Sequence, residues 1–332
     1  MLLRKLSELN GVSGNEKEVR DFIINEIKDY VADIKVDRLG NIIAYKKGLM
    51  ENETKIVVSA HMDEVGLMIN KINSEGLLGF TLVGDIDSRV LISKPVLVGD
   101  NKIKGVIGAK PIHLQKKDER KKSLEYNQLY IDIGSSSKEE SEKLINIGDY
   151  VSFDSNFIDF GDNLVKGKAL DNRAGCNILI DTIKRNSDIS FYAVFSVMKE
   201  IGIFGGEPAN YYINPDINII LDSSFKEKSL NNGPIISFME NRTHFSRDLT
   251  EKLASIAKDN NIDYQLSGFD CSSSDANKIQ TSGNGSKIAR ISIPCRYEFS
   301  PVNVMSTQDI NNTEKLLIET LKLLGGNNNG NE

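Results

Sequence analysis

Four residues that could hold a metal ion stand at the ends of predicted strands or at the start of a predicted helix. KIVVSA leads into His61, SFYAVFSVM is followed by Lys199-Glu200, INIIL ends at Asp222, and Asp171 opens the helix DNRAGCNILI. Ligands of open α/β sheets bind at the carboxyl ends of strands, so these side chains should gather on one rim of one sheet. Zinc takes imidazole and carboxylate oxygen, and a carboxylate can bridge two ions. The pattern therefore predicts a divalent metal site.

A further carboxylate, Asp63, lies two residues after His61. On an extended chain, side chains two residues apart point to the same side, so the Asp63 carboxylate should lie near the His61 imidazole. A carboxylate in that position can orient a metal-bound imidazole through its second ring nitrogen. Asp63 is therefore predicted to position His61 rather than to bind the metal.

Each of these residues also has an ordinary structural interpretation. An Asp at a helix start, such as Asp171, is usually an N-cap, and Asp222 could simply begin a turn. Glu200 could be a solvated strand end, and a lone His after a strand is more often a hydrogen-bonded structural residue than a ligand. The joint placement of the four residues, not any single one, favours the metal site.

The pattern of apolar residues predicts which elements position this site. Residues 16–31 have the spacing of an amphipathic helix. Between about residues 67 and 160, short β-like pieces are separated by Gly, Asp and Asn turns, which predicts a small β-barrel or sandwich. After residue 165, strands alternate with helices, as is typical of a doubly wound sheet.

The predicted architecture is therefore α/β, with a doubly wound sheet interrupted by a small β-barrel domain. Residues 1–66 and 160–325 are expected to form the discontinuous α/β domain, and residues 67–159 the inserted domain. The low-complexity tail, residues 326–332, is expected to be disordered.

Composition excludes several classes of protein. The 332 residues carry a formal net charge of -6, which argues against nucleic acid because phosphate contacts need clustered Lys and Arg. No apolar run approaches the roughly 20 residues that span a bilayer, and the first residues turn polar too soon for a signal peptide. Three separated cysteines, with no C-x-x-C pair, indicate a reducing compartment, so a cytoplasmic protein is expected. His113 and His244 fall outside the site pattern, although His113 could reach a subunit interface.

Motifs distributed along nearly the whole chain resemble the glutamyl and deblocking aminopeptidases. They are SAHMDEVGLMI, GVIGAKPIH, LYIDIG, GDYVSF, KGKALDNRAGC, EIGIFGG, INIILDSS, SSSDANKIQ and ISIPCRYEFSPVNV. Members of that family are dinuclear metallopeptidases that build tetrahedral particles of twelve subunits. The resemblance implies a catalytic α/β domain with a doubly wound metallopeptidase-type sheet and an inserted small β-barrel domain used for oligomerisation. It also implies peptides as substrates and zinc or cobalt as the metal.

The resemblance also implies a role for each matching residue. His61 and Asp222 would hold one ion, Asp171 would bridge two ions, and Glu200 would hold the second. Asp63 would orient His61, in agreement with its spacing.

Two positions depart from the family pattern. Lys199 stands where the family has the Glu that acts as general base, and Phe299 stands where it has the His that completes the second metal site. An ammonium cannot accept a proton from water, and phenylalanine has no lone pair for a metal. We therefore expect one divalent ion or none rather than two, with the Lys199 ammonium paired with Asp171 and Glu200 in place of the lost ion. Glu298 is expected to point away from Phe299 on an extended chain and not to replace the His.

These departures predict a metallo-aminopeptidase with weakened or lost activity. The main alternative is a non-catalytic protein that binds peptides or assembles with active relatives through the insert. A glycoside hydrolase that uses paired carboxylates is disfavoured, because the chain has no Trp for stacking against sugars and its carboxylates are placed as metal ligands.

Overall fold

The computed structural model describes residues 1–49, 54–111, 113, 115, 117, 121, 123–185, 188–224, 230–270 and 272–325. The expected disordered tail and Cys271 lie outside the described residues. Within these ranges, no helix combines the length and the apolar character that crossing a bilayer requires.

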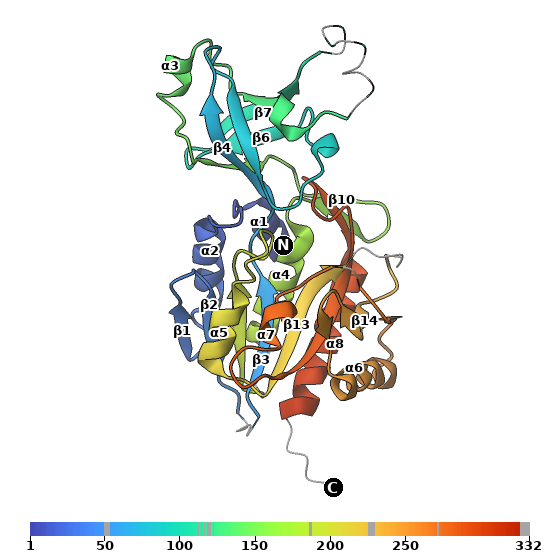
Figure 1. The fold of residues 1–332 in the computed structure, drawn as a ribbon. Coiled ribbons are helices and arrows are strands. Elements are labelled where there is room, and N and C mark those ends of the chain that lie inside the picture. Colours follow the sequence, from blue (N-terminus) through green and yellow to red (C-terminus); the bar gives the residue numbers. More distant parts are fainter. Residues whose placement is uncertain are drawn as a thin grey trace.

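The main body is built on one large mixed sheet (Figure 1). Its strand order is β1-β2-β12-β3-β13-β18-β19-β11-β10, and β12, β3, β13 and β18 run parallel. The bounds are β1 Asp33–Val36, β2 Ile42–Lys46, β12 Phe191–Ser196, β3 Ile56–His61, β13 Ile217–Ser224, β18 Lys287–Arg296, β19 Asn303–Ser306, β11 Leu164–Gly167 and β10 Ile158–Phe160. β14 (Ile235–Ser237) joins β18 and pairs with β17 (Gln265–Ser267), while β15 (Met239–Glu240) and β16 (Thr243–His244) form a separate hairpin.

Helices cover both faces of this sheet, which confirms the doubly wound architecture. One core contains side chains of α1 (Leu2–Glu8), α2 (Lys17–Ile27), α4 (Leu170–Arg185), α6 (Arg247–Asp259) and α8 (Thr307–Gly325). Smaller cores hold α5 (Gly206–Ile213) and α7 (Ala276–Ile279) against β2, β3, β12, β13 and β18. In α6, Leu249, Leu253 and Ile256 recur at helical spacing and are buried, so a single apolar stripe fixes this helix on the sheet.

The insert is a closed barrel with a core of its own, which confirms the barrel interpretation. Its strands follow the order β4-β5-β8-β7-β6-β9. The bounds are β4 Gly66–Ile72, β5 Leu78–Val83, β8 Leu129–Asp132, β7 Ile103–Ala109, β6 Pro95–Val98 and β9 Tyr150–Phe153, with a short helix α3 at Lys138–Ser141. β10 pairs with β11 in the large sheet, so the barrel strands themselves end at Phe153.

The barrel leaves the main domain directly beyond the end of β3 (Figure 1). Gly66 begins β4, and a Cβ there would lie 2.5 Å from Val12 Cγ2 and 2.8 Å from the Val151 carbonyl oxygen, so only glycine fits. At the end of β5, Gly84 has a φ of +95°, and a Cβ on it would lie 3.5 Å from Glu200 Cβ. The barrel therefore lies against the rim on which the predicted site residues stand.

Candidate metal centre

Three of the predicted ligands converge beside the neighbouring parallel strands β3 and β13. His61 ends β3, Asp222 lies near the end of β13, and Asp171 is at the start of α4. His61 Nε2 is 3.3 Å from Asp171 Oδ1 and 3.5 Å from Asp222 Oδ1. One ligand atom from each lies within 4.8 Å of the others, and all three residues are buried. This imidazole and carboxylate set matches the donors that zinc takes.

Unpaired polar atoms at this point fit a bound cation. Among the described residues, His61 Nε2 and Asp171 Oδ1 have no hydrogen-bond partner although both atoms are buried. Burying such atoms without a partner costs free energy, and a divalent ion between them would remove that cost. Burial opposes protonation of His61, but the surrounding carboxylates outweigh it and raise its pKa well above the usual range. The carboxylates around His61 thus favour a positive charge at this position, either a proton on the imidazole or a bound cation.

Asp63 lies on the far side of the imidazole from this cluster. Its Oδ1 is 3.3 Å from His61 Nδ1, and its Oδ2 accepts a hydrogen bond of 2.9 Å from the Glu200 backbone N–H. The carboxylate therefore contacts the ring nitrogen that faces away from Asp171 and Asp222. This is the geometry that the two-residue spacing predicts.

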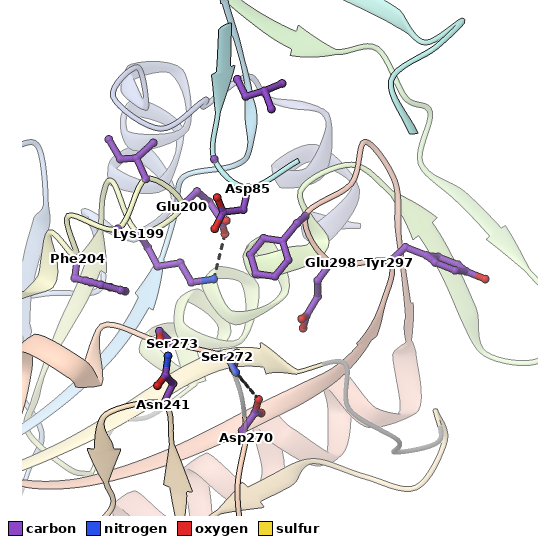
Figure 2. Close-up of a pocket in the computed structure, with 15 residues that line it drawn as sticks. Asp85, Lys199, Glu200, Phe204, Asn241, Asp270, Ser272, Ser273, Tyr297 and Glu298 are labelled. Carbon is purple, nitrogen blue, oxygen red and sulfur yellow. Dashed lines mark hydrogen bonds and ion pairs between the residues drawn. The ribbon is translucent and has the colours of Figure 1, made fainter. Parts of the chain in front are cut away.

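Lys199 brings an ammonium group into the same cluster. Its Nζ is 3.1 Å from Glu200 Oε1 (Figure 2). The same atom is 4.0 Å from both Asp171 Oδ2 and Asp222 Oδ1. Burial favours the neutral amine, but these three carboxylates outweigh it and raise the pKa of Lys199 well above its usual range. Burial also raises the pKa of Glu200, to about 7, against the opposing effect of Lys199. The ammonium thus lies beside Glu200 and Asp171, as expected, and also approaches Asp222.

The segment after β18 differs from the expectation for an extended chain. Tyr297 and Phe299 have φ angles of +65° and +55°, in the left-handed region, which breaks the alternation of side chains. Glu298 and Phe299 both line the same cleft, and the expectation of an extended chain is wrong at Tyr297 and Phe299. The Phe299 ring centroid lies 5.7 Å from Lys199 Nζ, and the ring contacts the ammonium rather than a ligand atom.

A buried arginine that the sequence patterns did not single out supports Asp222. Arg290, in β18, is fully buried, and its guanidinium lies 2.8 Å from Glu240 Oε2, 3.5 Å from Asp270 Oδ2 and 3.6 Å from Asp222 Oδ2. Burial opposes ionisation of Asp222, but Lys199 and Arg290 hold its pKa well below the usual range. The sequence did contain a signal for this residue, namely an Arg within the apolar run KIARISI. An arginine buried in a strand requires partners of opposite charge.

A cleft of about 1000 Å³ opens beside the cluster. Lys199 and Glu200 line it, together with Glu298 and Phe299, whereas His61, Asp171 and Asp222 are not among its lining residues. A molecule that enters the cleft therefore meets the Lys199 ammonium before it meets the three converging ligands.

The other histidines and the described cysteines take no part in this cluster. His113 lies in the insert and His244 in β16, and both are exposed. Cys176 and Cys295 are buried free thiols. Burial raises the pKa of Cys176 to about 12, so it remains a thiol, and it donates a hydrogen bond to the His61 carbonyl oxygen.

Asp275 should make the stability of the metal-free protein depend on pH. Burial raises its pKa to about 6, while the Ser196 hydroxyl donates to its Oδ2. The pKa of Asp275 in the folded protein exceeds the unfolded value of about 3.9. The contribution of its protonated carboxyl group to the free energy of unfolding is therefore complete below about pH 4 and is lost as pH rises through about 6. We expect Asp275→Asn to remove about 1–3 kcal/mol of this pH dependence, measured by urea unfolding between about pH 4 and pH 7 in chelator. Parallel profiles of both proteins would contradict the assignment.

Comparisons with known proteins agree with this fold and identify the family. The sequence profile of the M42 glutamyl aminopeptidase family matches residues 40–316. The lysyl aminopeptidase of Pyrococcus furiosus is 32% identical over an alignment of 339 residues, gaps included, and the alignment covers 97% of each chain. The TET aminopeptidase of a marine sediment archaeon, Thaumarchaeota archaeon SCGC AB-539-E09, superposes with a TM-score of 0.93 at 30% identity, covering 98% of this chain and 97% of that chain.

A third relative is described as an assembly. The Pyrococcus horikoshii TET1 peptidase, which can assemble into a tetrahedron or a large octahedral shell, is 35% identical, with a TM-score of 0.87 and coverage of 96% of this chain and 97% of that chain. The family profile covers well over half of the present chain, and the structural likeness extends over both the large sheet and the barrel. This chain therefore belongs to the M42 glutamyl aminopeptidase family of metal-dependent peptidases, as the resemblance of its motifs predicts.

Proposed function

We propose that this protein binds one divalent ion, zinc or cobalt, and releases N-terminal residues from peptides at a strongly reduced rate. His61, Asp171 and Asp222 would hold the ion, and Asp63 would orient His61. The observation that carries the proposal is the convergence of one atom from each ligand within 4.8 Å, directly beside the Lys199 ammonium. A bound ion would supply Lewis-acid polarisation of the peptide carbonyl.

The charges around Lys199 support one ion rather than two or none. The ammonium lies within 4.0 Å of the carboxylates of Asp171, Glu200 and Asp222. With His61 neutral and Glu200 ionised, as they would be beside a bound ion, one positive charge against three negative charges leaves a deficit that a single divalent ion balances. Arg290 does not close this deficit, because Glu240 and Asp270 also surround it. A second ion would have to displace the ammonium or lie beside it, which like-charge repulsion disfavours.

The same lysine accounts for the reduced rate. A protonated amine cannot remove a proton from water, and general-base catalysis typically contributes about a hundredfold to ten-thousandfold. Burial raises the pKa of neighbouring Glu200 to about 7, but its Oε1 lies 3.1 Å from Lys199 Nζ. In the proposed enzyme, Lys199 and Glu200 therefore neutralise each other instead of activating water.

Metal content tests this proposal directly. The protein is equilibrated with excess zinc, desalted and measured by elemental analysis, and we expect about one ion per chain. His61→Ala should retain none, whereas His244→Ala, which changes an exposed histidine, should retain one. Chelator should abolish any release of N-terminal residues. Two ions per chain would mean that another group replaces the missing His, and no ion would reject the metalloenzyme.

A non-catalytic peptide-binding or assembly protein is the second candidate. It is supported by the position of Lys199 between the cleft and the three converging ligands. A zinc-loaded protein that binds peptides without releasing any N-terminal residue would favour this candidate over the enzyme.

Assembly and location complete the proposal. We expect a homo-oligomer formed through the inserted barrel, because the barrel is a separately packed unit beside the site and because the related Pyrococcus horikoshii TET1 peptidase can assemble into a tetrahedron or a large octahedral shell. A cytoplasmic location is proposed from the odd and widely spaced cysteines, since Cys176 and Cys295 are free thiols.

A further inference from the structure

The chain that carries Lys199 and Glu200 turns sharply after β12. On an extended chain, consecutive side chains point to opposite sides, yet Lys199 Nζ lies 3.1 Å from Glu200 Oε1 (Figure 2). Met198, the residue before them, has a φ of +58°, in the left-handed region, which costs free energy for any residue with a Cβ. The Gly202 backbone N–H closes a turn onto the Lys199 carbonyl oxygen at 2.9 Å. Contacts from outside this loop must therefore stabilise its conformation.

Three buried side chains from other segments hold this loop by its backbone N–H groups. Asn41 Oδ1 accepts from Val197 at 3.0 Å, Glu16 Oε1 from Met198 at 3.2 Å, and Asp63 Oδ2 from Glu200 at 2.9 Å. Asp63 is already placed beside the His61 imidazole. Of the three side chains, Glu16 is the one that bonds to the left-handed residue itself.

Glu16 joins this loop to the start of the first long helix. It stands at the N-cap position of α2 and is 3% exposed. Its Oε1 also accepts a hydrogen bond of 2.8 Å from the Gly14 backbone N–H, so one carboxylate oxygen bridges the segment before α2 and the loop after β12. Glu16 is neither among the residues that line the cleft nor among the converging ligands. It therefore acts on the site through the loop that it holds, not by contact.

We propose that Glu16 is a positioning residue, which holds the Met198 backbone in its left-handed conformation and so presents the Lys199 ammonium to the three carboxylates of the cluster. The inference deepens the proposed function and rests on it only for the metal-binding readout below. Without this acceptor, Met198 would relax toward the right-handed or extended conformations that residues with a Cβ prefer. The Lys199 side chain would then leave a cluster in which its charge opposes the entry of a divalent ion.

The reactivity of Lys199 in the metal-free full chain is the first test. The protein is treated with an acetylating N-hydroxysuccinimide ester in chelator, and peptide mass spectrometry follows the acetylation of each lysine. Native Lys199 should react slowly, because its carboxylate partners favour the unreactive ammonium. In Glu16→Ala it should react about tenfold faster, the effect of a pKa lower by about one unit on the fraction of free amine. Glu16→Gln, which keeps an oxygen acceptor, should react at the native rate.

Matched controls separate positioning from a general loss of structure. Lys168 is a second buried lysine, paired with Glu64 at 2.7 Å, and its rate should not change. Loosening of the whole fold would instead accelerate both lysines. Asp21→Ala removes an exposed carboxylate from the same helix and should leave Lys199 at the native rate. If Glu16→Ala does not fold, Glu16→Asp replaces it, because this side chain keeps the charge but is too short to reach Met198.

Zinc affinity is the second readout. Competition with a chromophoric chelator gives the Kd for zinc, and we expect Glu16→Ala to bind zinc about tenfold more tightly than the native protein, because the ammonium retreats from the ion. Removing a negative charge would by itself weaken zinc binding, so the direction of the change distinguishes positioning from a direct charge effect. In a Lys199→Met background, Glu16→Ala should leave the Kd unchanged, since the side chain that it positions is absent.

Several results would overturn the inference. They are an unchanged rate at Lys199 in Glu16→Ala, equal acceleration of Lys199 and Lys168, faster reaction in Glu16→Gln, zinc binding that is not tightened in Glu16→Ala, and an effect of Glu16→Ala on the Kd that persists without Lys199. A native protein that binds no zinc, while Glu16→Ala still accelerates Lys199, would reject only the proposed metalloenzyme. A native protein that binds one zinc, but whose Lys199 does not respond to Glu16→Ala, would reject only the role of Glu16.

Discussion

The double variant Lys199→Glu with Phe299→His should bind two zinc ions per chain and release N-terminal residues about a hundredfold to ten-thousandfold faster than the native protein. The first change removes the ammonium that lies 3.1 Å from Glu200 and 4.0 Å from Asp171. It also supplies a carboxylate that can accept a proton from water, which is the source of the expected factor. The second change provides an imidazole where the Phe299 ring now contacts Lys199. Elemental analysis and an aminopeptidase assay measure the two effects.

Two further variants separate the effect of the second metal ion from the effect of the general base. Lys199→Gln with Phe299→His removes the ammonium and adds the ligand without a base, so it should bind two ions and gain much less activity. Phe299→His alone should stay at one ion, because the ammonium remains. A Lys199→Glu, Phe299→His protein that binds two ions yet remains inert would show that the pocket has lost catalysis elsewhere. One that still binds a single ion would contradict the role given to Lys199.

Replacing Arg290 with methionine should lower the free energy of unfolding by about 3–5 kcal/mol, the usual cost of removing one partner from a buried ion network. Arg290 is fully buried and lies within 3.6 Å of carboxylate oxygens from Glu240, Asp270 and Asp222. Methionine fills part of the space but leaves these carboxylates without their shared cation. Unfolding in urea, followed by circular dichroism, measures the loss.

A surface arginine provides the matched control for this variant. Arg247 pairs with Glu251 on the exposed side of α6, so Arg247→Met should not change the unfolding midpoint measurably. Adding Glu240→Gln to Arg290→Met removes one of the stranded carboxylates and should restore part of the stability. An Arg290→Met protein as stable as the native one would mean that these carboxylates do not depend on the guanidinium.

Metal content and the position of Lys199 are linked by the same electrostatics. Asp171, Glu200 and Asp222 are held close together, and each ion or ammonium that enters the cluster must reduce their repulsion. In the proposed enzyme, the Lys199 ammonium and one divalent ion together meet this requirement. Variants of Lys199 are therefore expected to change metal binding and catalysis together.

Local patterns in the sequence determined the fold and most of the converging residues. Period-two and helical spacing predicted the alternation of strands and helices, since each element must bury one apolar face. The same patterns predicted that His61 and Asp222 meet, because both end apolar strands, and neighbouring parallel strands end on the same rim. The resemblance of the motifs also predicted two departures from the family pattern, at Lys199 and Phe299.

Other features depended on contacts between distant parts of the chain. Arg290 reaches Asp222 and Glu240 only because β18 packs between β13 and β14, a pairing that no local pattern specifies. The backbone at Tyr297 and Phe299 is left-handed, whereas the sequence suggested an extended chain.

The sequence by itself thus determined which residue types stand on the rim of the sheet, and the tertiary structure decided which atoms meet there. Side-chain periodicity is a property of a few consecutive residues and can be read along the chain. The 3.1 Å contact of Lys199 with Glu200 and the unpartnered oxygen of Glu298 instead depend on loop conformation and on packing against other elements. Those distances are fixed only when the strands, helices and barrel pack together.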